Sequence, residues 1–393
     1  MKILVVCQYY YPEPLRVSDL CEELTLRGHE VQVVTGRPNY PEGEIYPGYE
    51  DRDKTDETIR GVKVHRCPIV PRGTDSLHRF LNYFSYPLSA ARYVKRLPSD
   101  YDLVFINQLS PVMMAWPGMV YQRKWKKPAV LYCLDLWPES LMAGGVRKGS
   151  LIYRAFHLIS GSIYRRMDRI LVTSRSFLTH LEKEHGVPRE KAEYLPQYAE
   201  TVFDGIEPRG FDGTCRLLFA GNIGKAQSLD TVLDAAERLK NQPVLFQIAG
   251  GGTELTRLQQ IAADHGLTNV CFFGRRPLEE MRAFYQNADA MLVTLRADPV
   301  LSLTLPGKVQ SYMAAGRPII GAINGETADV VREAKCGFCG PAEDAEALAE
   351  NIRLFVNSAD KASLGKNARA YYTTHFQRVQ FMEKLEKEMR AVL

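Results

Sequence analysis

The chain contains 393 residues, more than a single hydrophobic core usually supports, so we expect two domains. Its 45% hydrophobic and 24% charged residues are ordinary for a globular protein, and a net charge of +4 is too weak to indicate a nucleic-acid partner. Residues 1–200 carry 28 basic and 23 acidic side chains, so the first half is better suited to meet an anionic surface.

The cysteines and the N-terminal residues predict a reducing, cytoplasmic compartment. Eight cysteines are scattered along the chain, and MKILVVCQYY at the start holds an apolar run of only one strand's length. Cys336-Gly-Phe-Cys339 has redox or zinc spacing but no partner pair, so we interpret it as an incidental loop pair. Asp51 and Asp53 resemble a metal-binding carboxylate pair, but their charged loop (DRDKTDE) favours a solvated surface. The best candidate for a membrane span, residues 103–120, is broken by polar residues and prolines.

The first half alternates strands and helices. Residues 3–7 (ILVVC) form a short buried run of the kind that parallel strands require. An amphipathic stretch over 17–27 and an apolar run over 31–35 complete a strand–helix–strand unit. Further apolar runs, separated by longer helical patterns, lie at residues 103–106, 129–133 and 170–173. This alternation predicts a doubly wound sheet.

Residues 196–214 (PQYAETVFDGIEPRGFDGT) are rich in proline, glycine and polar side chains and suit a linker. The alternation then restarts, with apolar runs at residues 217–220, 245–249, 270–273, 290–294 and 318–323. Helices are expected near residues 228–240, 253–265, 277–287, 307–315, 344–356 and 361–391. Two Rossmann-like halves usually bind a ligand between them, beyond the carboxyl ends of the strands.

The loops after the strands of the second half combine glycines with cations. They are Gly221-Asn222-Ile223-Gly224-Lys225, Gly250-Gly251-Gly252-Thr253-Glu254, Gly274-Arg275-Arg276-Pro277 and Leu305-Pro306-Gly307-Lys308. Glycine lets the backbone approach a ligand, and a helix N-terminus offers unpaired N–H groups with a positive dipole. The set predicts a diphosphate or nucleotide site, with plain turns as the alternative. No loop matches the P-loop pattern, and residues 8–14 after the first strand lack the glycines of a dinucleotide site.

Five stretches carry a resemblance to a known family: GHEVQVVTGRPNYPEG, LDLWPES, LPQYAE, AGNIGKAQSLDTVLDAA and PGKVQSYMAAGRPI. In this order they resemble the family 4 retaining glycosyltransferases of the GT-B fold, and more narrowly the bacterial WbuB-like subgroup of surface-polysaccharide clusters. The resemblance implies an α/β protein with two Rossmann-like domains facing each other across a cleft. Residues 1–200, joined by the final helix 375–393, would bind the acceptor, and residues 201–374 the nucleotide-sugar donor. Transfer would retain the anomeric configuration without a metal ion or cofactor.

The glycine- and cation-containing loops and the family resemblance together predict the donor site. Lys225 and Lys308 are expected to stabilise the leaving diphosphate, and Glu326, after Gly325, to complete the sugar pocket. A solvated lysine and a plain loop carboxylate are the alternatives for Lys308 and Glu326. The remaining donor-binding predictions are Asn222, Gly224, Gly250, Gly252, Gly274, Arg275, Arg276, Leu305, Pro306, Gly307 and Ser311.

The chain departs from the family pattern at three places. Many members carry two glutamates where this chain has Leu303 and Ser311, so the usual carboxylate contacts to the sugar and ribose are absent or moved. Ser311 is still able to hydrogen-bond a ribose, and Leu303 suits a methyl group, as in an N-acetylated or 6-deoxy hexose. A Gly-Gly pair in the first loop is also missing, and Arg16 is predicted to supply the phosphate contact in its place.

The chemistry points to one residue of the first half. Departure of a nucleoside diphosphate builds negative charge, so preorganised electrostatics should dominate. No paired carboxylates present themselves, which favours same-face attack over a covalent intermediate. Asp135 follows a buried strand and is the best candidate to hold the acceptor or a sugar hydroxyl, with Glu139 as the reserve and Glu13 as a further acceptor contact. A helix-start carboxylate without a catalytic role is the alternative for Asp135.

Two basic–aromatic stretches bear on the acceptor. They are residues 78–98 (HRFLNYFSYPLSAARYVKRLP) and residues 123–127 (RKWKK). Such stretches suit an interfacial membrane contact, although a core helix with a basic flank and a surface loop are the alternatives. If both lie on one side of the first domain, the acceptor is a lipid-linked sugar diphosphate at the cytoplasmic membrane face.

The leading prediction is therefore a retaining hexosyltransferase with a UDP-linked donor and a lipid-linked oligosaccharide acceptor, in O-antigen or capsule biosynthesis. It would act at the inner face of the plasma membrane as a peripheral protein, without a nucleic-acid partner. A nucleotide-sugar 2-epimerase of the same fold and a catalytically degenerate scaffold are the alternatives. The epimerase is disfavoured because none of the eight histidines follows a strand of the second half.

Overall fold

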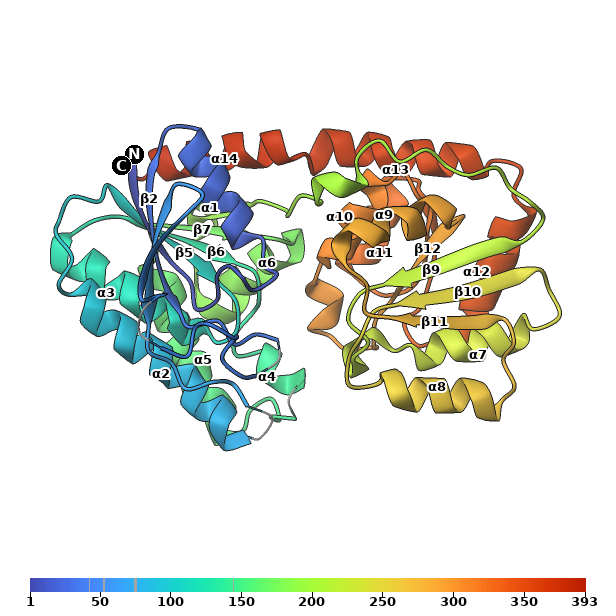
Figure 1. Ribbon diagram of the computed structural model, residues 1–393, viewed down its shortest axis with the longest axis horizontal. Coiled ribbons are helices and arrows are strands. Elements are labelled where there is room, and N and C mark those ends of the chain that lie inside the picture. Colours follow the sequence, from blue (N-terminus) through green and yellow to red (C-terminus); the bar gives the residue numbers. More distant parts are fainter. Residues whose placement is uncertain (42, 52–53, 74–75, 144) are drawn as a thin grey trace. The chain divides into compact units, whose positions relative to one another are not determined.

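The computed structural model describes residues 1–41, 43–51, 54–73, 76–143 and 145–393. It divides into two compact units, drawn in Figure 1: unit 1 is Met1–Leu195 with Met382–Leu393, and unit 2 is Pro196–Phe381. The division lies a few residues from the predicted one at 200/201 and 374/375. Arg52 and Asp53 of the charged loop lie outside the described residues.

Unit 1 is built on one sheet of strand order β3-β4-β2-β1-β5-β6-β7-β8, in which every pairing is parallel except the antiparallel β3–β4 pair. Its strands are β1 (Lys2–Val6), β2 (Glu30–Gly36), β3 (Asp56–Ile59), β4 (Val62–Cys67), β5 (Leu103–Gln108), β6 (Ala129–Cys133), β7 (Arg169–Val172) and β8 (Ala192–Tyr194). Its helices are α1 (Val17–Leu26), α2 (Ser76–Val94), η2 (Val112–Ala115), α3 (Trp116–Trp125), α4 (Ser140–Ala143), α5 (Leu151–Arg166), α6 (Arg175–His185) and η3 (Arg189–Lys191).

Helices cover the sheet of unit 1 (Figure 1). The pair α2 and α3 packs together, with α3 on β1, β5 and β6, while α1 packs on β2 and β4. The end of α14 (Arg378–Arg390) returns to this unit, where Glu386 lies 2.9 Å from the Nε2 atom of His29. Polar contacts within unit 1 hold the end of this helix, including the 3.0 Å ion pair between Arg169 and Glu388.

Unit 2 is a second doubly wound sheet, of order β11-β10-β9-β12-β13-β14, with parallel pairings throughout. Its strands are β9 (Cys215–Ala220), β10 (Val244–Ala249), β11 (Val270–Gly274), β12 (Ala290–Thr294), β13 (Ile319–Ala322) and β14 (Gly337–Gly340). Its helices are η4 (Thr201–Phe203), η5 (Lys225–Gln227), α7 (Asp230–Arg238), α8 (Leu255–Asp264), α9 (Leu278–Asn287), η6 (Leu301–Leu303), α10 (Gly307–Ala314), α11 (Glu326–Glu333), α12 (Ala345–Asn357) and α13 (Lys361–His375), followed by the start of α14.

Alternation along β9 explains the two layers of core in unit 2. Leu218 and Ala220 belong to a cluster with α9, α10 and α11, whereas Leu217 and Phe219 belong to a second cluster with α7, α8 and α12. Successive side chains of a strand point to opposite faces, so a continuous apolar run serves both clusters. The apolar run read from the sequence is thus a central strand buried on both faces.

Helix ends follow ordinary capping chemistry. The Ser150, Ser174 and Asp344 side chains accept hydrogen bonds from backbone N–H groups two or three residues later, which satisfies donors that a helix start leaves unpaired. Gly186 ends α6 in the left-handed region at φ 64°, which glycine adopts without a steric penalty. These signals are local and therefore readable from the sequence.

The structure corrects three sequence expectations. Cys336 and Cys339 were interpreted as a loop pair, but Cys339 lies within the edge strand β14 and Cys336 directly before it. The β3–β4 hairpin was not foreseen, because its short strands alternate polar side chains and carry no continuous apolar run. The single helical stretch expected over 361–391 is two helices, α13 and α14, separated at Phe376 and Gln377.

Candidate functional site

The loops of unit 2 that the sequence predicts to bind the donor meet where the strand order reverses. From β9 the chain winds to β10 and β11 on one side, while β12, β13 and β14 lie on the other. Ligands of doubly wound sheets bind outside the carboxyl ends of the strands at such a switch point. The loop after β9 begins at Gly221, and the loop after β12 leads to Lys308 at the start of α10.

Close backbone contacts explain the glycines of two of these loops. The Gly221 N–H donates to Ala249 O at 3.0 Å, and the Ile223 N–H donates to Gly251 O at 2.8 Å. A Cβ atom on Gly250 would lie 1.8 Å from Gly221 O, and one on Gly252 would lie 2.3 Å from Ile223 O. Both predicted positions therefore lie in the expected loops, where a side chain would disrupt loop packing whether or not a ligand is bound.

Lys308 lies inside this arrangement rather than on a solvated helix surface. Its Nζ atom donates to Gln227 Oε1 at 2.5 Å and lies 4.0 Å from the ring centroid of Phe219. The same atom is 3.2 Å from where a Cβ of Gly221 would be, so the lysine crosses directly over the glycine loop. Among the described residues it forms no ion pair, and burial lowers the pKa of its ammonium group to about 7.

Tyr312 connects α10 to the end of β9. Its hydroxyl donates to Ala220 O and accepts from the Ala220 N–H, both at 3.0 Å. Because Tyr312 is one turn beyond Lys308, these two bonds hold the helix start beside the first donor loop. Pro306 precedes the helix in extended conformation (φ −62°, ψ 136°), and no side chain caps the N-terminal amides. A helix start of this kind presents N–H groups and positive dipole to an anion.

The remaining predicted donor residues lie on the loops around the start of α10. Asn222 and Lys225 are exposed on the loop after β9, and Lys225 also lines a polar cavity of about 430 Å³ with Arg257 and Arg296. Gly274 O accepts from the Gly250 N–H at 2.8 Å, which joins the third loop to the second. The other predicted donor positions are half-buried or buried in the same loops; they are Gly224, Leu305, Pro306 and Gly307.

The two arginines after β11 differ from each other. Arg275 is exposed, with its Nε atom 3.7 Å from where a Cβ of Gly251 would be, so it lies over the second glycine loop. Arg276 turns back, since its Nε donates to Phe273 O at 3.0 Å and its Nη1 lies 3.6 Å from the Glu280 carboxylate. Arg275 is therefore the better placed of the pair to meet a ligand at the glycine loops.

A carboxylate that the sequence reasoning missed lies beside Ser311. The Ser311 hydroxyl donates to Glu200 Oε2 at 2.8 Å, and Glu200 directly precedes η4 at the beginning of unit 2. The family resemblance leads us to expect a glutamate at position 311, and here a carboxylate from another segment lies next to that position. The stretch LPQYAE ends in Glu200 and was a signal for family resemblance, but 111 residues separate it from Ser311 in the sequence.

Glu326 is not a loop residue, as the alternative had it, but the first residue of α11, where it is 4% exposed. Gly325 before it has φ 67°, and a Cβ there would lie 2.1 Å from Ser302 O. Thr327 Oγ1 donates to Thr304 O at 2.8 Å. The start of α11 is thus packed against residues 302–304, immediately before the turn that leads to Lys308.

In unit 1, Asp135 follows β6 and is held by the chain around it. Its carboxylate accepts a hydrogen bond from the Ser110 hydroxyl, which also accepts from Trp137 Nε1 at 2.7 Å. Gln108 Nε2 donates to the Asp135 carbonyl at 2.9 Å. Burial raises the pKa of the Asp135 carboxyl to about 6, although the hydrogen bonds from Ser110 and Ser140 favour the ionised form.

Glu13, predicted to contact the acceptor, and Arg16, predicted to contact a phosphate, both lie between β1 and α1. Glu13 is 2% exposed, and its carboxylate accepts three backbone hydrogen bonds of 2.8 Å, from Tyr10, Asn39 and Tyr40. It therefore joins the first loop to the loop after β2, and we assign it to loop support rather than to direct acceptor contact. Arg16 is half-buried at the residue before α1.

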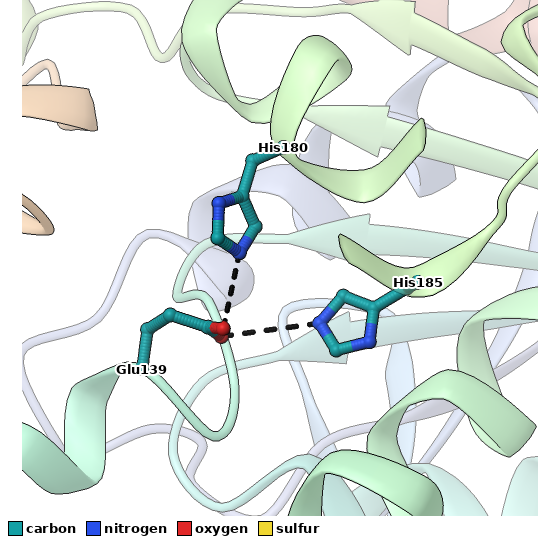
Figure 2. Close-up of side chains that lie close together, drawn as sticks. All are labelled: Glu139, His180 and His185. Atoms are coloured by element: carbon teal, nitrogen blue, oxygen red, sulfur yellow. Dashed lines mark ion pairs between the residues drawn. The ribbon is translucent and has the colours of Figure 1, made fainter. Parts of the chain in front are cut away.

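Glu139 belongs to a buried group with two histidines (Figure 2). Its Oε1 atom lies 3.1 Å from His180 Nε2, and its Oε2 atom lies 3.9 Å from His185 Nε2. The Tyr153 hydroxyl donates to Oε1 at 3.0 Å. Burial alone would raise the pKa of Glu139, but these histidines outweigh it and hold the pKa well below its usual range. At 3% exposure the side chain is not available as a direct acceptor contact.

The two basic–aromatic stretches lie on the same helix pair. The first is most of α2, and the second is the end of α3 with Lys126 and Lys127. Lys124 Nζ donates to Lys95 O at 2.6 Å, which links the basic ends of both stretches. At the other end, Phe80 and Leu81 are 54% and 43% exposed. Within the described ranges, no helix has both the length and the apolar character needed to cross a membrane.

A second exposed apolar group lies at the start of α5. Leu151 is 83% and Ile152 59% exposed, next to exposed Arg154. The ring of Trp137 connects this helix to α2, since it contacts Tyr83 at 5.7 Å and Phe156 at 5.3 Å between centroids. The starts of α2 and α5 therefore present apolar side chains from neighbouring helices of unit 1.

Two family models match successive parts of the chain. "Glycosyl transferase 4-like domain" matches residues 15–197, and "Glycosyl transferases group 1" matches residues 209–371. Among curated proteins, the chain is 29% identical over 346 residues to WcaI of Escherichia coli K12, named as a colanic acid biosynthesis glycosyl transferase. That match covers 80% of this chain and 82% of WcaI.

Solved structures show the same architecture. Sucrose-phosphate synthase from Thermosynechococcus elongatus matches with a TM-score of 0.79 at 17% identity, over 100% of this chain and 98% of that chain. HepE from Anabaena, in complex with UDP and glucose, matches with a TM-score of 0.73 at 15% identity, over 99% of both chains. At these identities the likeness establishes the fold, which is GT-B, with two Rossmann-like units.

Proposed function

Because the chain belongs to the family 4 glycosyltransferases, we propose that it transfers a hexose from a UDP-linked donor to a lipid-linked saccharide acceptor, with retention of configuration. The likeness to WcaI supports a place in surface-polysaccharide biosynthesis, as does the resemblance to the WbuB-like subgroup, which stays a prediction. Unit 2 would bind the donor and unit 1 the acceptor.

The observation that carries this proposal is the placement of Lys308. A half-buried lysine without an ion pair among the described residues lies over the glycine loop at the switch point of the sheet, beside an uncapped helix start. Burial lowers its pKa to about 7, because the buried ammonium group loses the compensation that water gives to its charge. A donor diphosphate would supply that compensation, and the lysine would in turn stabilise the charge that builds as the nucleoside diphosphate leaves.

Glu200 refines the donor side of the proposal. The hydrogen bond between Ser311 and Glu200 places a carboxylate beside the position that contacts the ribose in many relatives. We assign Glu200 as the ribose-binding carboxylate, with Ser311 orienting it. HepE, of the same fold, binds UDP, which supports a uridine nucleotide here. An apolar Leu303 supports an N-acetylated or 6-deoxy sugar.

The reaction would proceed by same-face attack. The acceptor hydroxyl attacks the anomeric carbon on the face from which the diphosphate leaves, and the leaving phosphate takes up its proton. The bond from the anomeric carbon to the phosphate oxygen breaks, and the bond to the acceptor oxygen forms, so configuration is kept. Lys308 and the α10 amides stabilise the departing charge, and Asp135 orients a hydroxyl group.

Nucleotide binding tests this proposal directly. We expect UDP to bind more tightly than GDP and ADP in isothermal titration calorimetry, and UDP-sugars to be hydrolysed slowly without acceptor. Glu200→Gln should weaken UDP binding about tenfold, since a hydrogen bond to a charged group contributes roughly 1.5 kcal/mol. Glu207→Gln, an exposed glutamate of the same segment, is the matched control. Binding without any turnover would instead favour the scaffold, and release of a free 2-epimer the epimerase.

Binding should also take up a proton. A diphosphate raises the pKa of Lys308 from about 7, so at pH 8 a largely neutral lysine becomes protonated when UDP binds. Affinity is then highest near or below pH 7 and falls as pH rises above it, by up to tenfold per pH unit. Calorimetry at pH 8 in buffers of different ionisation enthalpy should give an uptake approaching one proton. Lys308→Met should abolish this uptake, and an unchanged value in that variant would refute the assignment.

We also propose a peripheral contact of unit 1 with the inner face of the plasma membrane. The exposed apolar side chains at the starts of α2 and α5 lie beside the basic residues Arg79 and Arg154. Apolar side chains that enter the acyl boundary, flanked by cations that meet anionic headgroups, are the features of an interfacial contact. A lipid-linked acceptor would be reached from such a position.

Introduction of acidic side chains at the start of α5 tests the membrane contact. The double substitution Leu151→Glu and Ile152→Glu should reduce co-sedimentation with phosphatidylglycerol-containing vesicles at least tenfold, because it removes apolar area and adds repulsion. The single substitution Leu354→Glu, on a leucine of unit 2 that is 48% exposed, should leave sedimentation unchanged. Equal losses in both variants would show that the effect is not specific to α5.

A further inference from the structure

The histidine–glutamate group of unit 1 has no role in the proposed transfer, yet its atoms converge. His180 and His185 both lie on α6, and their Nε2 atoms face the Glu139 carboxylate, which follows β6 by a short loop (Figure 2). One ligand atom from each of the three residues lies within 4.8 Å of the other two. The side chains of Glu139 and His185 are 3% and 0% exposed, and that of His180 is 12% exposed.

Hydrogen bonding does not account for this convergence. His185 is 2% exposed, and neither of its ring nitrogens has a hydrogen-bond partner. His180 Nε2 lies 3.1 Å from Glu139 Oε1 but without hydrogen-bond geometry. Buried imidazole nitrogens are normally satisfied, since leaving them unpaired is costly. A buried histidine without a hydrogen-bond partner, directed at a carboxylate and a second imidazole, points to a ligand for all three.

We propose that Glu139, His180 and His185 bind a divalent transition-metal ion of the zinc class. Ligand atoms at about 2.0–2.2 Å from a tetrahedral zinc lie roughly 3.3–3.5 Å from one another. The two histidine–glutamate separations of 3.1 and 3.9 Å bracket that value, and all three ligand atoms lie within 4.8 Å of one another, so side-chain shifts on the order of 1 Å would complete the site. Two imidazoles and one carboxylate suit zinc, cobalt or nickel, whereas magnesium and calcium prefer oxygen ligands.

The surroundings fit such a site. The Tyr153 hydroxyl donates to Glu139 Oε1 at 3.0 Å, which orients the carboxylate as outer partners of metal ligands do. His157 stacks on His185 at 4.7 Å between centroids and helps fix the plane of its ring. The ion would connect α6 to the loop that carries Asp135, four residues before Glu139. It therefore holds the shape of unit 1 and takes no part in the chemistry at the donor.

Metal analysis of the full chain, with any affinity tag removed, tests the proposal. After loading with zinc chloride and gel filtration, wild-type protein should retain about one equivalent of zinc by mass spectrometry. Replacement with Co²⁺ should give visible absorption bands of a tetrahedral site. Glu139→Gln and His180→Gln should each lower the retained zinc at least tenfold, and His265→Gln, an exposed histidine of unit 2, should retain it.

The zinc content of the wild-type protein tests the proposal even if a variant fails to fold. Less than about a tenth of an equivalent of zinc in the wild-type protein, with no change in melting temperature on zinc addition, would overturn the proposal. Glu139 would then serve only as the ion-pair partner of the two histidines. Full retention by a folded His180→Gln variant would overturn it as well, because the ion would be bound elsewhere. Nucleotide binding by unit 2 is measured separately, so these outcomes do not depend on the proposed transfer.

Discussion

Substitution of Lys308 by methionine is expected to lower the turnover of donor about 10²- to 10³-fold, the loss that follows removal of one preorganised charge contact in other enzymes. The lysine lies 2.5 Å from Gln227 and over Gly221, where the diphosphate is proposed to bind. Methionine fills a similar volume without the charge, so the packing against Phe219 is kept. Turnover of UDP-sugar, followed by UDP release in a coupled assay, measures the effect.

Stability distinguishes this loss from unfolding. A lysine whose pKa is lowered by burial destabilises the ligand-free protein below that lysine's ordinary pKa of about 10.4, because the unfolded chain binds the proton more strongly. Lys308→Met should therefore melt at the same temperature as wild type or higher at pH 7, while its activity falls. Lys366→Ala, on the exposed side of α13, is the control and should change neither quantity. A variant that melts lower and loses activity in proportion would contradict the role in catalysis.

The loops of the proposed donor site are readable from the sequence because they depend on short-range signals. Apolar runs locate the strands, and the switch point places their carboxyl-end loops together once a doubly wound order is assumed. Lys308 stands out in the sequence as a cation just after Pro306 and Gly307. The pattern does not reveal that the lysine is half-buried and without an ion pair among the described residues, since burial depends on Gly221 and Gln227 from another loop.

Long-range pairings were beyond the sequence reasoning. Glu200 meets Ser311 only because the linker passes beside α10, and no local periodicity records that. Glu13 and Glu139 follow strands of unit 1, as acceptor contacts would, but backbone amides and histidines from distant segments enclose them. The glycines at 250 and 252 were read as ligand contacts, whereas the backbone oxygens of Gly221 and Ile223 already require them. A motif therefore locates a loop without separating its ligand contacts from its packing contacts.

Asp135→Asn is expected to lower kcat about 100-fold while leaving the affinity for UDP unchanged. The residue lies in unit 1, and the donor loops are all in unit 2, so nucleotide binding does not require it. Asparagine preserves the shape and the contact to Ser110 but cannot carry the negative charge that would orient a hydroxyl proton. Calorimetry with UDP and turnover at saturating donor separate the two quantities, and a kcat within threefold of wild type would remove Asp135 from the catalytic residues.

The pH profile supplies the sharper test of the same residue. Burial raises the pKa of Asp135 to about 6, so the carboxylate is protonated below that pH and kcat should fall as pH decreases through 6. The residual activity of Asp135→Asn should lack this acid limb. Ser110→Ala removes a hydrogen bond that favours the ionised carboxylate, so it should shift the limb to higher pH. An acid limb that stays in the same place in Ser110→Ala would mean that a different group titrates, because the Ser110 hydroxyl donates to the Asp135 carboxylate.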